Sequence, residues 1–162
     1  PGADLGQPHA AQRRWRRAQR ERTPVALLLV DIDHLGSYNA LYGHKAGNDA
    51  IKRVSVVLRE SLWRPGDELA RFDGAVFAVV LPNTDNLGAR VVAVRVREGV
   101  SELGISHDES PAGLVTATVG VAAAWPGKDE EGLGWGGLVA RASEALRQGK
   151  EAGRNRVAEG TE

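Results

Sequence analysis

The sequence predicts an α+β two-layer fold in which a central, mostly antiparallel sheet is flanked by helices, and three observations support this prediction. Residues 25–30, VALLLV, form a short continuous apolar run that is typical of a central strand buried on both faces. Residues 46–63 repeat apolar side chains at helical spacing. Residues 68–81 favour a hairpin, because two strand-like runs flank Asp73-Gly74, a dipeptide suited to a turn with positive φ.

The remaining elements follow from the second half of the chain. Asn83 or Thr84 is expected to cap a helix that runs to about residue 100. The apolar side chains expected to face inward on this helix are Leu87, Val91 and Val94. Further predicted segments are a strand at 114–122, a helix at about 138–151 and a short strand near 156–157. This order is a ferredoxin-like β-α-β-β-α-β arrangement with additions.

Two loops and the N-terminal segment complete the organisation of the chain. The loops at 103–113, which contains His107, and at 125–136 carry Gly and Pro and are expected at the surface. Residues 1–22 are predicted to be an N-terminal helical connector that carries six arginines, and residues 23–162 a single domain. We favour a solvated helix leading to an upstream domain over a nucleic-acid arm, because no second basic patch follows.

Composition limits the classes of function. The formal net charge of zero gives no reason to expect binding to nucleic acid or to an acidic membrane surface. No apolar run approaches the length of a bilayer span, so membrane insertion is not expected. The absence of Cys excludes disulfides and thiolate metal sites and suits the cytoplasm. Because the chain has no Met, even at position 1, we expect it to be part of a longer protein.

The segment DIDHLGSYNALYGHKAGNDAI, residues 31–51, resembles the first half of the GGDEF family, the diguanylate cyclases. Four further pieces fall at the spacing of that family: WRPGDELARFDGAVF, AVRVR, TATVGVA and KEAGRNRV. The resemblance covers nearly the whole chain from Val25 to Val157 and implies a fold of the nucleotide-cyclase or polymerase-palm type. The N-terminal turn of the family is at best shortened here, in DLGQPHAAQRR.

The resemblance also implies a chemistry. Members of the family condense two GTP molecules into cyclic di-GMP in a dimer, with assistance from Mg²⁺, so a homodimer and GTP are expected partners. The metal clamp would join Asp31 to an acid in the hairpin turn. A carboxylate at the end of a central strand also suits a ligand site on general grounds. The alternative interpretation of Asp31 is a capping or loop aspartate.

The hairpin turn departs from the pattern of the family. The sequence has Asp73-Gly74-Ala75-Val76-Phe77 where the family has Gly-Gly-Asp/Glu-Glu-Phe. Ala75 and Val76 replace the metal-binding acid and the following glutamate, and neither can coordinate Mg²⁺ or transfer a proton. Asp73 adds a negative charge where the nucleotide phosphates would lie. The sequence therefore predicts a degenerate GGDEF domain with no catalytic residues and no required cofactor, and with Mg²⁺ present only if GTP binds.

Parts of the GTP pocket persist by resemblance. Asn39 matches a guanine-contacting asparagine, whereas Asn48 replaces a guanine-reading aspartate and loses the charge-assisted hydrogen bonds. Lys150 and Arg154 match phosphate-contacting residues, although cations are also favoured at the end of any helix. With Asp31, these residues form the predicted degenerate GTP pocket.

A second predicted nucleotide site lies before the turn. Arg64-Pro65-Gly66-Asp67 has the spacing of the family's inhibitory R-x-x-D site, which binds cyclic di-GMP. A guanidinium can meet O6 and N7 of guanine together, and an aspartate can accept from the ring N–H and amino groups. Arg95 falls where the family has a further arginine for this ligand. Without this position, R-x-x-D would be read as an ordinary surface ion pair.

The leading hypothesis is therefore a catalytically inactive cyclic di-GMP receptor within a larger bacterial signalling protein. Its expected partners include the other domains of that protein or a separate protein. The alternative is a protein-interaction or dimerisation module without tight nucleotide binding. An active diguanylate cyclase and a GTP-binding allosteric domain are further alternatives.

Overall fold

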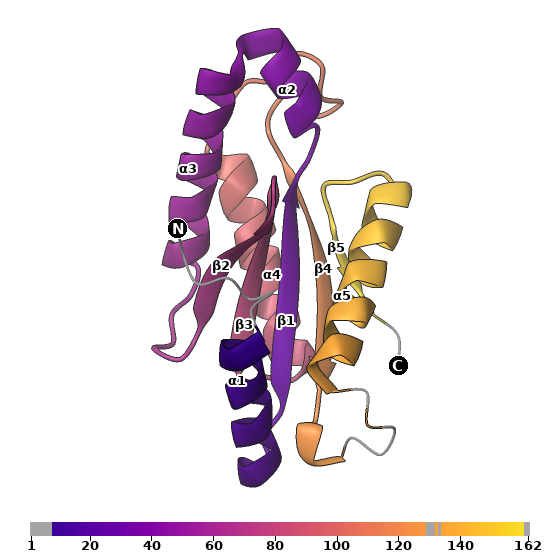
Figure 1. Cartoon of the computed structure of the whole chain (residues 1–162). Helices are drawn as coiled ribbons and strands as arrows, with labels where there is room; N and C mark the ends of the chain where they lie inside the picture. Colours follow the sequence, from indigo (N-terminus) through magenta and orange to yellow (C-terminus); the bar gives the residue numbers. More distant parts are fainter. Residues whose placement is uncertain (1–7, 129–131, 133, 161–162) are drawn as a thin grey trace.

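The central strand of the sheet is β1 (Val25–Ile32), and every other strand is placed relative to it (Figure 1). The computed structural model describes residues 8–128, 132 and 134–160. Its strand order is β2-β3-β1-β4-β5, with antiparallel pairing throughout except between β4 and β5, which are parallel. The prediction of an α+β fold with a mostly antiparallel sheet is confirmed. The other elements are α1 (Pro8–Glu21), α2 (Leu35–Tyr42), α3 (His44–Glu60), β2 (Glu68–Asp73), β3 (Val76–Pro82), α4 (Asn86–Glu102), β4 (Ala117–Ala124), a 3-10 turn (Pro126–Lys128), α5 (Gly134–Glu151) and β5 (Val157–Glu159).

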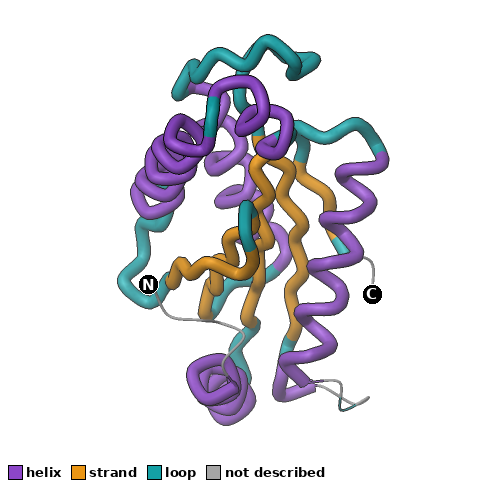
Figure 2. Tube along the Cα trace, turned by 45° about the horizontal axis from the view of Figure 1, so that its top comes forward, coloured by secondary structure: helices purple, strands orange, loops and turns teal. Residues whose placement is uncertain are grey.

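The alternation of side chains along β1 divides the core into two clusters. Leu28 and Val30 face one side of the sheet, where α2, α3 and α4 cover them. Leu27 and Leu29 face the other side, where α5 packs together with Trp15 and Ala18 of α1. Figure 2 shows the helices on both sides of the strands. Since both faces are covered, a continuous apolar run is the pattern that this strand requires.

The hairpin lies where the sequence predicts it, with its turn one residue later. Asp73 ends β2 and pairs with Val76, so that Gly74 and Ala75 form the turn. Gly74 has a φ of +33°. A bulge between Arg71 and Asp73 shifts the register and accounts for the difference.

The helix after β3 differs from the prediction at its start. It begins at Asn86, and Asp85 rather than Asn83 or Thr84 is the cap. The Gly88 N–H donates to Asp85 Oδ1 at 2.9 Å. The Thr84 hydroxyl instead donates to the Pro82 carbonyl at 2.9 Å, so it is not available for capping.

The predicted inward face of α4 is wrong. Leu87, Val91 and Val94 are 74%, 59% and 36% exposed. The buried face consists of Ala89, Ala93, Val96 and Val100. Both stripes have helical spacing, and the stripe with two alanines faces the sheet because small side chains let the helix approach the strands closely.

The loop at 103–113 is not simply a surface loop, because it folds back over the α2 end of the sheet. His107 is fully buried there, and its Nε2 lies 3.0 Å from the His34 carbonyl oxygen. The other buried side chains of this loop are Ile105 and Ser110. Residues 129–131 and 133 of the second predicted loop, and residues 1–7 of the predicted connector, lie outside the described residues.

At Gly120, β4 approaches the backbone of α5 closely, and substitution of this glycine tests the packing. A Cβ at residue 120 would lie 2.5 Å from both the Ala142 carbonyl oxygen and the Leu146 nitrogen, which are backbone atoms. We expect Gly120→Ala to lower the free energy of unfolding by about 1–3 kcal/mol in a urea titration. The control is Gly136→Ala in α5, where a Cβ meets nothing within 4 Å. Equal stability of the two variants would contradict this account of the packing.

Candidate functional site

The carboxyl end of β1 brings together two residues of the predicted GTP pocket. Asp31 is the second-last residue of the strand, and its Oδ2 forms an ion pair with Nζ of Lys150 in the last turn of α5. The Asp31 side chain is 14% exposed, so the pair is partly shielded from water. The lysine ammonium therefore already supplies a positive charge to this carboxylate.

The hairpin turn lies directly beside Asp31, as the family resemblance implies. Asp31 pairs with Val76 across the sheet, and the Ile32 N–H donates to the Ala75 carbonyl at 3.3 Å. The Gly74 carbonyl accepts from the Arg71 guanidinium. The two turn residues thus contribute no carboxylate, and both of their carbonyls are engaged. Asp73, which directly precedes them at the end of β2, is exposed. A single carboxylate in an ion pair with lysine does not fit the two-acid clamp for Mg²⁺.

Asp33, which the sequence did not mark as a site residue, holds the neighbouring segments in place. Its buried carboxylate accepts from the hydroxyls of Thr116 at 2.8 Å and Thr118 at 2.6 Å. It also accepts from the backbone N–H of Asn155 at 3.0 Å. This last bond fixes the turn after α5 that carries Arg154, where Arg154 has a φ of +63°. Only the D-x-D pattern after a buried strand could have indicated this residue.

The two predicted guanine-contacting residues lie on the α2–α3 segment. Asn39 on α2 packs against Gly47 of α3, and a Cβ at residue 47 would lie 1.7 Å from Asn39 Oδ1. This Oδ1 is buried without a hydrogen-bond partner among the described residues, so it could accept from a ligand. Asn48 on α3 is exposed. In the described part of the chain, neither asparagine is hydrogen-bonded to the Asp31–Lys150 pair.

The R-x-x-D segment forms a tight turn between α3 and β2. The Arg64 N–H donates to Asp67 Oδ2 at 3.4 Å, and the Asp67 N–H donates to the Arg64 carbonyl at 3.0 Å. The Arg64 guanidinium reaches the connection before α4, where its Nη1 donates to the Asn83 carbonyl at 3.3 Å and to Thr84 Oγ1 at 3.1 Å. The two residues are therefore linked through the backbone rather than by a side-chain ion pair.

Arg95 joins this turn from α4. Its Nη1 donates to the Ser61 carbonyl at 2.8 Å, and its guanidinium carbon lies 3.3 Å from the centroid of the Trp63 ring. Trp63 is itself fixed by its indole N–H, which donates to the Glu60 carbonyl at 3.0 Å. Trp63 was not predicted as a site residue, and its position directly before Arg64 is the one sequence signal that points to it.

The environment of Asp67 connects the three predicted residues. Burial raises the pKa of Asp67 above its ordinary value, although the hydrogen bond from the Arg64 backbone and the charges of Arg64 and Arg95 act in the opposite direction. Its Oδ1 is buried and has no hydrogen-bond partner within the described chain. A carboxylate oxygen without a donor, close to two arginines, is suited to accept hydrogen bonds from a ligand.

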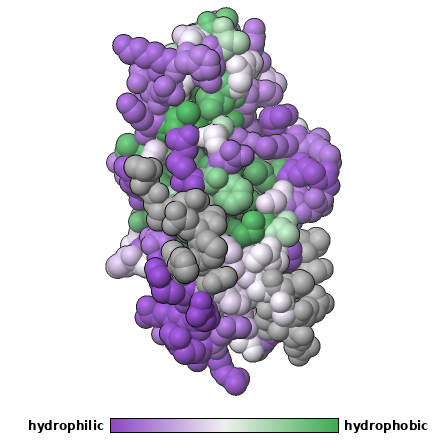
Figure 3. All heavy atoms as spheres, viewed as in Figure 1, coloured by the Kyte–Doolittle hydropathy of each residue, from purple (hydrophilic) through white to green (hydrophobic). Residues whose placement is uncertain are grey.

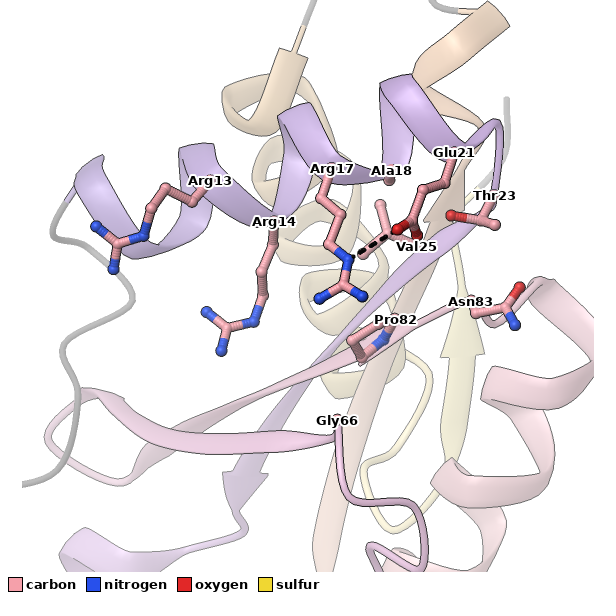
Figure 4. A pocket seen from close by; sticks show the side chains of 10 residues that line it. All are labelled: Arg13, Arg14, Arg17, Ala18, Glu21, Thr23, Val25, Gly66, Pro82 and Asn83. Atoms are coloured by element: carbon pink, nitrogen blue, oxygen red, sulfur yellow. Dashed lines mark hydrogen bonds and ion pairs between the residues drawn. The ribbon is translucent and has the colours of Figure 1, made fainter.

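A pocket of about 510 Å³ adjoins the other side of the R-x-x-D turn. Arginine side chains of α1 extend toward Gly66 and Pro82 (Figure 4), and the α1 end of the molecule is covered by hydrophilic side chains (Figure 3). Arg14 forms an ion pair with Glu68, and Arg17 Nε lies 3.0 Å from Glu21 Oε1. Glutamates thus balance part of the positive charge of this pocket.

The comparisons with known proteins agree with this architecture. A family model described as diguanylate cyclase, GGDEF domain, matches residues 8–156. The probable diguanylate cyclase DgcT of Escherichia coli K12 is 34% identical over 141 residues, which are 86% of this chain and 30% of DgcT. The coiled coil and GGDEF domain of DgcB from Caulobacter crescentus, in complex with c-di-GMP, superposes with a TM-score of 0.83 at 26% identity. That superposition covers 96% of this chain and 80% of the other.

A third comparison concerns a complex between two proteins. The diguanylate cyclase SiaD from Pseudomonas aeruginosa, in complex with its activator SiaC, superposes with a TM-score of 0.78 at 26% identity. The superposition covers 93% of this chain and 55% of SiaD.

These matches define the class as a nucleotide-cyclase domain, and the chain belongs to the GGDEF family. It spans about a third of the length of the curated relatives it matches. No helix among residues 8–128 and 134–160 is both long and apolar enough to span a bilayer.

Replacing Asp33 tests the buried network beneath the site. We expect Asp33→Ala to lower the free energy of unfolding by about 1–3 kcal/mol, because the donors from Thr116, Thr118 and Asn155 lose their common acceptor. A urea titration measures the change, with the exposed Asp49→Ala as a control. If the two variants were equally stable, Asp33 would not hold these segments together.

Proposed function

We propose that this chain is a GGDEF domain that does not turn over GTP and that acts as a cytoplasmic receptor for cyclic di-GMP in bacterial second-messenger signalling. Arg64, Asp67 and Arg95 form the receptor site. The observation that carries the proposal is the buried Asp67 Oδ1, which has no donor among the described residues and lies in the field of two arginines.

Guanine supplies the groups that this cluster lacks. Its ring N–H and amino group are neighbouring donors that can satisfy the Asp67 carboxylate once that side chain turns to bring its buried Oδ1 to the surface. Its O6 and N7 are acceptors for a guanidinium. The Arg95 guanidinium lies over the Trp63 ring and donates to the Ser61 carbonyl, so its position is fixed before the ligand arrives. The ligand carries two guanines, and one R-x-x-D turn satisfies one of them. The second requires another arginine, from a second ligand molecule, a second subunit or another face.

The loss of turnover follows from the residues beside β1. Ala75 and Val76 offer no carboxylate, and Asp31 is paired with Lys150. A metal clamp contributes several kcal/mol to the stabilisation of the transition state, so its loss lowers the rate by roughly a thousandfold or more. Asn39, Lys150 and Arg154 can still contact GTP, and we expect that binding to be weak and nearly independent of Mg²⁺.

A second candidate function is a protein-interaction module. The exposed apolar stripe of Leu87, Val91 and Val94 on α4 favours it. A structural relative, SiaD, has been solved with a protein activator bound. Such a module would keep the fold and bind no nucleotide tightly.

Calorimetric titration with cyclic di-GMP tests the receptor site. We expect Arg64→Ala to weaken binding by roughly tenfold to a hundredfold, because a contact to two guanine acceptors is worth about 1–3 kcal/mol. Arg147→Ala on α5 is the matched control, since that arginine lies beyond the opposite face of the sheet, and it should bind like the wild type. If the wild-type protein gave no heat response at high micromolar ligand, the result would contradict the receptor proposal and favour the protein-interaction module.

Direct measurement of product tests the lack of turnover. Micromolar protein with GTP and either Mg²⁺ or Mn²⁺ should yield no cyclic di-GMP by chromatography. Ala75→Glu alone should not restore activity, because Val76 and Asp73 remain unchanged. Product formation that disappears in Asp31→Ala would show that the site is a working enzyme.

The raised pKa of Asp67 predicts a stability cost at this site. The folded protein holds this proton more tightly than the unfolded chain, so the ionised carboxylate lowers the stability of the fold above its folded pKa. We expect Asp67→Asn to be more stable than the wild type at neutral pH, with the difference closing as the pH falls through the raised pKa toward 3.8. Thermal melts across this pH range measure the change. A variant that is less stable at neutral pH would show that the arginines outweigh burial.

A further inference from the structure

A groove of about 680 Å³ lies along the outer side of α4, beside the end of α3. Its large apolar lining residues are Val57, Trp63, Val91, Val94 and Leu103. The lining also includes Arg95, which is the residue that the groove has in common with the Arg64–Asp67–Arg95 cluster. The groove is therefore a separate surface that adjoins the proposed receptor site.

The apolar side chains of this groove have no covering element in the described part of the chain. Val91 and Val94 of the groove lie on one stripe of α4 with the exposed Leu87, which precedes Val91 by four residues and lies outside the groove lining. Trp63 beside them is 71% exposed. This stripe has the pattern of a core-facing helix but points to solvent, and such a contiguous apolar surface marks an interaction site.

Acidic side chains border the same groove. Glu60 lies on α3, and Glu98 and Glu102 continue the stripe of α4 beyond its apolar half. Glu98 Oε1 lies 4.0 Å from Nη2 of Arg97. Glu60 and Glu102 form no ion pair with any described residue. The one basic lining residue, Arg95, is stacked on Trp63 and bonded to the Ser61 carbonyl. The groove is therefore negatively charged.

We propose that this groove binds an amphipathic helix of a partner protein whose apolar stripe is bordered by Lys and Arg. A helix presents anchors at positions i, i+3, i+4 and i+7, which matches the spacing on α4. The stripe from Leu87 to Glu102 extends over about 22 Å at about 1.5 Å per residue, enough for about four helical turns. Basic residues beside the apolar stripe would face Glu60, Glu98 and Glu102.

The same charges argue against other occupants. An antiparallel α4 of a second copy would bring Glu98 and Glu102 against the apolar half of the first stripe and leave their charges unpaired. An anionic lipid surface would be repelled by the three glutamates. The proposal does not depend on cyclic di-GMP binding, because it uses the apolar and acidic residues of the groove.

The test uses two synthetic helical peptides of about 18 residues, long enough to span the stripe. Both carry leucine at the i, i+3, i+4 and i+7 positions, and one has lysine and the other glutamate at the bordering positions. Fluorescence anisotropy of the labelled peptides measures binding to the purified chain. We expect the lysine peptide to bind and the glutamate peptide not to bind.

Variants of the exposed residues locate the binding surface. Val91→Glu combined with Val94→Glu should weaken binding of the lysine peptide by roughly tenfold or more. Glu98→Lys combined with Glu102→Lys should reverse the preference toward the glutamate peptide. Leu41→Glu on α2 is the matched control for an exposed apolar residue and should change nothing. Thermal melts verify that each variant is folded.

Three results would overturn the proposal. The first is binding of both peptides with similar affinity, or of neither at high micromolar protein. The second is unchanged binding in the double glutamate variant. The third is a wild-type dimer in light scattering that dissociates in that variant, which would make a second copy of the chain the occupant. A cyclic di-GMP titration of the same variants reports separately on the receptor site.

Discussion

The eight residues of β1 are hydrogen-bonded to β3 on one edge and to β4 on the other, and helices cover both of their faces. This double burial determines where the chemically active groups lie. Asp31 and Asp33 flank Ile32, the last residue of the strand, so their positions are fixed by the packing of the buried residues of β1. Any chemistry at this edge of the sheet depends on what the neighbouring segments present to these two carboxylates.

The two aspartates meet very different partners. Asp33 is satisfied by two threonine hydroxyls and a backbone N–H, which makes it a structural tie between β1, β4 and the turn after α5. Asp31 meets Lys150 on one side and a turn without acids on the other. The turn after α3 contrasts with this edge, because Asp67 keeps a buried oxygen without a partner in the described chain, and burial raises the pKa of Asp67. This difference between the hydrogen bonding of the two aspartates beside β1 and that of Asp67 is the physical basis of the proposal that the ligand binds at the turn after α3.

The strands could be predicted from the sequence more accurately than the packing of α4 and the surroundings of the site. The apolar run of β1 and the Asp73-Gly74 signal report local constraints, so the strand and the hairpin appear where the sequence places them, although the bulge in β2 moves the turn by one residue. The face of α4 was mispredicted, since Ala89 and Ala93 offer the same helical spacing as Leu87 and Val91, and only the distance to the sheet decides between them. His107 is buried against the segment around His34, which lies far from it in the sequence. The contact between Trp63 and Arg95 likewise joins the turn after α3 to α4. No local pattern contains that information.

The central claim is that cyclic di-GMP binds at the turn after α3 and not beside β1. A titration of the ¹⁵N-labelled chain with cyclic di-GMP, followed by backbone amide shifts, tests it most directly. The account predicts saturable shifts for Ser61 to Asp67 and for the turn of α4 around Arg95, with the amides of Asp31 and Gly74 unchanged. Shifts centred on Asp31 and Gly74, or no shifts at millimolar ligand, would contradict it.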